Sequence, residues 1–118
     1  TQIAANLAMV AKLPKDLRDD LTVIFLTHSE DSTDINGNRK IKAKTIGKMI
    51  DNTLTLEGLF SIVLFGRAAR DEDGVLTYGF DTVTNGENTC KTPMEMFDAE
   101  FIANDLQVVK DAIKEYEN

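Results

Sequence analysis

The chain has 118 residues, a formal net charge of −7 and 42% hydrophobic residues, which suits one domain or a piece of one. The acidic balance argues against general coating of nucleic acid. No apolar run approaches the roughly 20 residues that a membrane span needs, and neither end carries a signal peptide, so the cytoplasm is the expected location. The single cysteine, Cys90, excludes an intrachain disulfide, and a small buried filler is its ordinary interpretation.

The first half of the chain predicts a helix, a buried strand and a hairpin. Apolar residues at helical spacing favour a helix over residues 2–12, and Pro14 ends it. The continuous apolar run over 21–26 is rich in β-branched residues, which is typical of a strand buried on both faces of a parallel sheet. Asn36-Gly37 predicts a hairpin turn. Residues 47–52 are compatible with a short helix.

The second half predicts further strands and a terminal helix. In chain order the patterns indicate a second buried strand (59–65), a charged turn (67–74), an alternating strand (75–83) and a hairpin turn at Asn85-Gly86. The last helix begins at a capping box, with Asn104 as N-cap and Gln107 reaching back. The resulting class is α/β with β-hairpins and a C-terminal helix. Two core-type strands leave sheet edges exposed, so upstream strands or a partner chain are expected to complete the sheet.

The charge is concentrated in one short segment. Residues 39–48 contain no acidic residue, which leaves 8 of the 13 basic residues against all 20 acidic ones elsewhere. The five cations of this segment are Arg39, Lys40, Lys42, Lys44 and Lys48, and the alternation predicts Lys40, Lys42 and Lys44 on one side of a strand. The segment is either a solvated hairpin face or a surface that contacts phosphates. It has no interleaved aromatic residue, which argues against a stand-alone base-stacking surface.

Chemistry can be assigned to few other residues. His28 is the only histidine and follows the predicted strand 21–26, and ligands of open α/β sheets bind beyond the carboxyl ends of strands. It is therefore either a hydrogen-bonded structural residue or a contact to a nucleotide phosphate, with Thr27 beside it. Lys91 is either a solvated lysine or a phosphate contact at a subunit boundary. Residues 32–43 have the phase of a calcium loop but lack ligands at its first and last positions, and zinc has too few histidines and cysteines.

Five segments resemble one known family, the RecA-like ATP-binding proteins of tailed phages that serve DNA recombination or replication. In family order, they are Leu17–Leu21, Phe25–Glu30, Lys44–Asp51, Lys91–Phe97 and Ile102–Leu106. The resemblance implies a RecA-like fold, ATP with Mg²⁺, a homo-oligomeric filament or ring, and single-stranded DNA or a recombination protein as partner, in the cytoplasm of the bacterial host. Residues 1–118 lack the G-x-x-x-x-G-K-[ST] loop and the magnesium-binding strand, which the family carries upstream.

The resemblance also implies roles for single residues. His28 corresponds to the γ-phosphate sensor, Thr27 and Lys91 to nucleotide contacts, and the hairpin Ser29–Lys44, with the five cations of residues 39–48, to a DNA-binding loop. The chain is therefore interpreted as the C-terminal portion of an ATPase that does not hydrolyse ATP by itself. Two other classes stay open. One is a non-catalytic module that binds nucleic acid through the hairpin, and the other is a structural protein that pairs through an exposed sheet edge.

Overall fold

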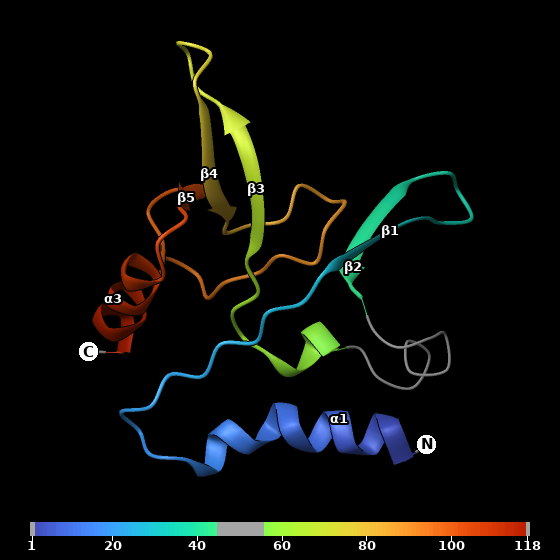
Figure 1. Cartoon of the computed structure of the whole chain (residues 1–118), viewed down its shortest axis with the longest axis vertical. Coiled ribbons are helices and arrows are strands. Elements are labelled where there is room, and N and C mark those ends of the chain that lie inside the picture. Colours follow the sequence, from blue (N-terminus) through green and yellow to red (C-terminus); the bar gives the residue numbers. More distant parts are fainter. Residues whose placement is uncertain (1, 45–55, 118) are drawn as a thin grey trace. The chain divides into compact units, whose positions relative to one another are not determined.

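The computed structural model describes residues 2–44 and 56–117 (Figure 1). Two compact units, Thr1–Phe60 and Ser61–Asn118, divide the chain. The described residues form a mixed α/β protein with two antiparallel sheets and a C-terminal helix. The mixed α/β composition, the hairpin at Asn36-Gly37 and the terminal helix are therefore confirmed. The short helix expected over 47–52, and Lys48 within it, lie outside the described residues.

The first unit has a small core, which forms where its helix and one strand of its hairpin contact the same 3-10 turn. Helix α1 (Gln2–Lys12) is followed by the 3-10 turn η1 (Leu13–Asp16), so the predicted helix and its end before Pro14 are confirmed. Strands β1 (Ser29–Thr33) and β2 (Arg39–Ala43) form an antiparallel hairpin. Both α1 and β2 contact the 3-10 turn η2 (Leu56–Leu59). Ala11 and Ile41 are the buried apolar side chains of this unit's described part.

The predicted buried strand over 21–26 is wrong. Residues 21–28 form no strand, and all of their side chains are exposed. The aromatic pair of Phe25 and Phe60, with ring centroids 5.1 Å apart, is an apolar contact of this segment. The apolar pattern is that of a strand, but a strand needs a neighbour with which to pair, and the described residues provide none.

The second unit contains a three-stranded sheet in the order β3-β4-β5, antiparallel throughout (Figure 1). Strand β3 (Phe65–Arg70) begins where the predicted strand 59–65 ends and continues into the predicted charged turn, so both of those predictions are wrong in their bounds. Strand β4 (Leu76–Asp81) confirms the strand expected over 75–83. It pairs next with β5 (Phe101–Ala103), so the turn at Asn85-Gly86 lies in a loop and does not close a hairpin.

The parallel sheet expected around the buried strands 21–26 and 59–65 is wrong, because every strand pair that the structure describes is antiparallel. The reason is local, because the two hairpins are closed by the same five-residue turn, D-x-[ND]-G-x, and connections this short join only antiparallel strands. In Asp34–Asn38 the first carboxylate accepts the backbone N–H groups of Asn36 and Asn38, both at 2.9 Å. In Asp71–Val75 the corresponding two bonds are also 2.9 Å long. The fourth residue is a glycine at φ +83° or +78°, a conformation that other residues adopt rarely.

Helix α3 (Leu106–Glu117) confirms the terminal helix but not its predicted cap. The N-cap is Asp105, whose carboxylate accepts the backbone N–H of Gln107 at 2.9 Å. The Gln107 side chain does not reach back, because it donates instead to Asp111 at 2.8 Å. Val109 is buried, whereas Leu106 at the start of the same predicted apolar face is 45% exposed. The helix is therefore only partly covered by the rest of the described chain.

Candidate functional site

The best candidate site is the hairpin of residues 28–44, called here the basic hairpin. His28 directly precedes β1, and its main-chain oxygen accepts the backbone N–H of Lys44 at 2.7 Å. This bond closes the open end of the hairpin. One backbone hydrogen bond therefore links His28, the predicted nucleotide sensor, to Lys44, one of the predicted DNA contacts. The sequence does not reveal this bond.

The two faces of strand β2 differ, as the alternation predicted. Ile41 is buried on one face, and Arg39 shares that face by strand periodicity. Lys40 and Lys42 lie on the other face, and Lys44 continues their phase one residue beyond the strand. The strand therefore confirms that Lys40 and Lys42 share one face, whereas Lys44 lies beyond its end. This face presents the cations from which a phosphate contact could be made.

The hairpin also brings an acidic strand against the basic one. Glu30 is directly opposite Lys42 in the register. Arg39 forms a bidentate ion pair with Asp31, with Nη2 donating to Oδ2 at 2.6 Å and Nε donating to Oδ1 at 3.1 Å. The side-chain hydrogen bond from Arg39 lowers the pKa of Asp31. The hairpin therefore carries four cations against three carboxylates, so its charge is far less positive than the run of residues 39–48 suggested.

The turn of the basic hairpin is also held by a carboxylate. Backbone N–H donation, first from Asn38, lowers the pKa of Asp34. One oxygen of this carboxylate is already occupied by two N–H groups, which makes it a structural group of the turn. Within the described ranges, no cluster of three or more His, Cys, Asp or Glu side chains is arranged to hold a metal ion.

The remaining described site residues, Thr27 and Lys91, are not part of the hairpin strands. Thr27 is exposed in the segment before His28. Lys91 belongs to the second unit, where its backbone exchanges two hydrogen bonds with Val63, at 2.8 and 2.9 Å. Its side chain is exposed. The backbone of Lys91 is thus held in place by its pairing with Val63.

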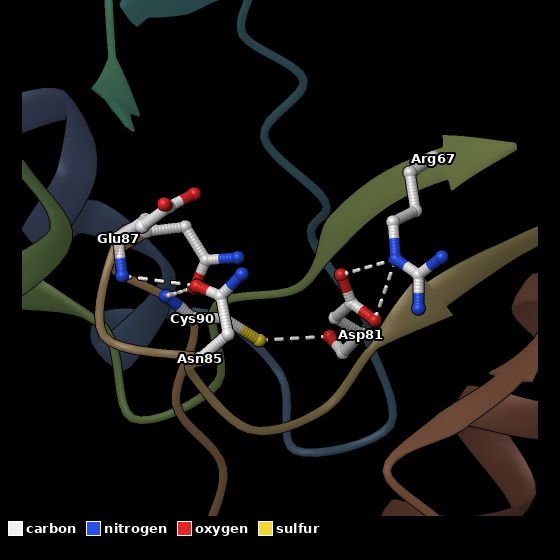
Figure 2. Close-up of polar contacts among 6 residues, drawn as sticks. Arg67, Asp81, Asn85, Glu87 and Cys90 are labelled. Carbon is white, nitrogen blue, oxygen red and sulfur yellow. Dashed lines mark hydrogen bonds and ion pairs between the residues drawn. The ribbon is translucent and has the colours of Figure 1, made fainter. Parts of the chain in front are cut away.

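A second polar cluster, which the sequence did not reveal, lies on the three-stranded sheet (Figure 2). Arg67 Nε donates to both carboxylate oxygens of Asp81, at 2.9 and 2.7 Å, and the guanidinium lies 4.3 Å from the centre of the Phe101 ring. Because Arg67 and Asp81 come from adjacent strands 14 residues apart, only the strand register could have predicted the pair. Arg67 uses its guanidinium to pair with Asp81 and to stack on Phe101, which favours a stabilising role of this cluster in the sheet.

The thiol next to this cluster is not activated. Cys90 is buried, and its sulfur donates to the main-chain oxygen of Asp81 at 2.8 Å (Figure 2). Burial raises the pKa of Cys90 to about 11. A thiol with such a pKa is almost entirely protonated at neutral pH and is a poor nucleophile. The geometry therefore favours the interpretation of Cys90 as a small buried side chain that fills space.

Comparison with protein-family models, with characterised proteins and with solved structures found no match. Among the described residues, no helix has the length and apolar character that crossing a bilayer requires.

Proposed function

We propose that the chain is the C-terminal portion of a RecA-like P-loop ATPase of phage DNA recombination or replication, and that its basic hairpin contacts single-stranded DNA. The five sequence segments that resemble this family support the proposal. ATP and Mg²⁺ would be held by motifs upstream of these residues, and the protein would act as a homo-oligomer, with DNA or a recombination protein, in the cytoplasm of the bacterial host. The sheet topology of the described strands neither requires nor supports the RecA-like core.

One observation carries the functional part of the proposal, namely the backbone hydrogen bond between His28 and Lys44. A contact between the His28 imidazole and a γ-phosphate would shift the residue that anchors the base of the hairpin. Because Lys40, Lys42 and Lys44 lie on the strand that ends at this anchor, such a shift would change how the cations meet a DNA backbone. The state of the nucleotide would in this way control affinity for DNA.

The first experiment measures the salt dependence of single-stranded DNA binding by the complete protein with ATP. Each phosphate contact on single-stranded DNA contributes roughly 0.7 to the slope of log K against log salt. Neutralising three contacts by Lys40→Gln, Lys42→Gln and Lys44→Gln should therefore lower the slope by about 2. The matched control neutralises three exposed lysines of the helical segments, Lys15, Lys110 and Lys114. Equal slopes for the two triple variants would exclude the hairpin as the DNA contact.

The second experiment tests the nucleotide step. His28→Ala in the complete protein should keep basal DNA binding but lose the increase in DNA affinity that ATP causes, because the imidazole would no longer report the γ-phosphate. Fluorescence anisotropy of a labelled oligonucleotide, with and without ATP, measures both quantities. Unchanged stimulation by ATP in this variant would remove His28 from the mechanism.

A second candidate function follows from a separate observation. The basic hairpin is formed in this chain, with five residue pairs joining β1 and β2, although the chain contains no phosphate-binding loop. A non-catalytic nucleic-acid-binding module would use the hairpin in this form. It predicts salt-sensitive DNA binding by residues 1–118 alone that ATP does not change.

A further inference from the structure

His28 extends the lysine face of the basic hairpin, which is the face that carries Lys40, Lys42 and Lys44. The main-chain oxygen of His28 accepts the backbone N–H of Lys44 at 2.7 Å, and the next residues inward, Ser29 and Ala43, are partners in the register. His28 and Lys44 therefore lie directly opposite each other, just outside the paired strands. Side chains of opposed residues in an antiparallel pair lie on the same face, with Cβ atoms about 4.5–5.5 Å apart.

The charged groups near His28 on this face come from both strands of the hairpin. Glu30, two residues further along β1, is half-buried and lies opposite Lys42. Outside the hairpin, β2 contacts η2, whose sequence contains one titratable residue, Glu57. The side chain that β2 buries is Ile41, which lies on the opposite face from His28, and His28 itself is exposed. Within the hairpin, the lysine face thus carries three lysines and one carboxylate, and a proton on His28 adds a fourth cation.

The His28 imidazole is the group on this face whose charge changes near neutral pH. Histidine gains or loses its proton between about pH 5 and pH 8, whereas lysine stays charged and carboxylates stay ionised over most of this range. His28 is the only histidine in the sequence. Burial raises the pKa of the Cys90 thiol to about 11, so this group stays protonated as well. Apart from the α-amino group of the chain, a change in binding across this range can therefore be assigned to one side chain.

We propose that the His28 imidazolium is a fourth phosphate contact of the lysine face, so that the binding of single-stranded DNA to the hairpin is coupled to the uptake of a proton. This inference rests on the DNA contact proposed above, and it gives the imidazole a phosphate of the DNA backbone in addition to any nucleotide phosphate. A phosphate held beside the ring favours its protonated form, because a nearby opposite charge stabilises the cation. By linkage, protonation then strengthens DNA binding by the same factor.

The test is the affinity of the complete protein for an oligothymidylate without terminal phosphates, measured by fluorescence anisotropy without nucleotide at about pH 5.5 and about pH 8. We expect binding roughly two- to fivefold tighter at the lower pH, which is the effect of one exposed ion pair. The slope of log K against log salt should also be larger there by roughly 0.7, the contribution of one phosphate contact. A pH effect that appears only after ATP is added would assign the imidazole to the nucleotide and would overturn the proposal.

Two substitutions of His28 fix its charge. His28→Gln should bind at both pH values as the parent does at about pH 8, where the neutral imidazole adds nothing to basal DNA binding. His28→Lys should bind at both pH values as the parent does at about pH 5.5, because lysine keeps its charge. Both variants retain the main-chain bond to Lys44, and protected amides in β1 and β2 would verify that the hairpin is intact.

The matched control moves the histidine to the other face of the hairpin. Thr33 lies opposite Arg39, on the face that carries Ile41. His28→Gln combined with Thr33→His should therefore bind DNA equally well at both pH values. A pH effect in this control would overturn the proposal, because the face of the hairpin would then not matter.

The salt slopes separate this inference from the function proposed above. Equal affinity of the parent at both pH values, with a slope that the triple lysine substitution still lowers, would overturn the inference and leave the DNA contact in place. A triple lysine variant with an unchanged slope would overturn both, because the lysine face would then not meet DNA.

Discussion

We expect the Gly79→Ala substitution to destabilise the three-stranded sheet, although Ala is normally preferred to Gly in a strand. The space above Gly79 is already filled by the Phe101 ring. A Cβ at this position would lie 2.5 Å from Cζ and 2.7 Å from Cε2 of that ring, far inside ordinary contact, and would also clash with the main-chain oxygen of Ile102. The oxygen belongs to the paired strand β5, so it cannot move without disturbing the β4–β5 pairing.

The expected loss in the free energy of unfolding has two sources, the overpacking around the new Cβ and the loss of the contact between Arg67 and the Phe101 ring. Overpacking of this kind typically costs about 1–3 kcal/mol. A displaced Phe101 ring would also leave the Arg67 guanidinium, which now lies 4.3 Å from its centre, and an exposed cation–π contact is worth roughly 0.5–1 kcal/mol. The lower entropy of the unfolded Ala chain returns about 0.4–1 kcal/mol. The net loss in the free energy of unfolding should therefore be about 2 kcal/mol.

Urea unfolding of the variant and the parent chain measures this difference. The matched control is Gly66→Ala on β3, where a Cβ would meet only the Phe80 ring at 3.8 Å, an ordinary contact. That variant should be neutral or slightly stabilised. The reasoning about the Phe101 ring fails if the two alanine variants unfold at the same urea concentration.

Three further outcomes are expected. Below pH 9, Cys90 should react with iodoacetamide about 100-fold more slowly in the folded chain than in urea, because burial raises its pKa from 9.0 to about 11; equal rates would contradict this. The lowered pKa of Asp31 should stabilise the basic hairpin above about pH 4, and this contribution should disappear as pH falls through the lowered value. Asp31→Asn should remove that part of the acid dependence of hairpin amide exchange. Glu95→Gly should raise the thermal midpoint, since Glu95 has φ +67° and a left-handed conformation costs residues other than Gly roughly 1–2 kcal/mol; a lower midpoint would contradict this.

The features that the sequence predicted correctly are those with local causes. The turn at Asn36-Gly37 is specified by residues that tolerate positive φ, and α1 ends where Pro14 prevents its continuation. The alternation of Lys40 and Lys42 follows from the pleat of a strand, whatever its partner. Each of these features is decided within a few residues, so no tertiary contact is needed to predict it.

The features that the sequence missed depend on residues distant in the chain. The apolar run over 21–26 has the pattern of a strand, but pairing depends on a neighbour that the pattern does not contain. The ion pair between Arg39 and Asp31 follows from the hairpin register, which also places Glu30 opposite Lys42. The hairpin is therefore far less positive than residues 39–48 alone, because the acidic strand β1 lies beside the basic strand β2. The N-cap of α3 was misplaced by one residue, since Asn104 and Asp105 are both good caps.

The repeated D-x-[ND]-G-x turn has a consequence for the order of folding. Each turn fixes a hairpin through pairs of residues that are close in the chain, from Thr33 with Arg39 and Arg70 with Leu76 outward, and isolated hairpins form within roughly 1–10 μs. Strand β5 joins β4 only after a connection of 19 residues, from Thr82 to Glu100, has closed. Both hairpins should therefore form early during folding, each with its register already set. The β4–β5 pairing, and with it the stacking of Arg67 on Phe101, should then be a late step whose loss mainly speeds unfolding.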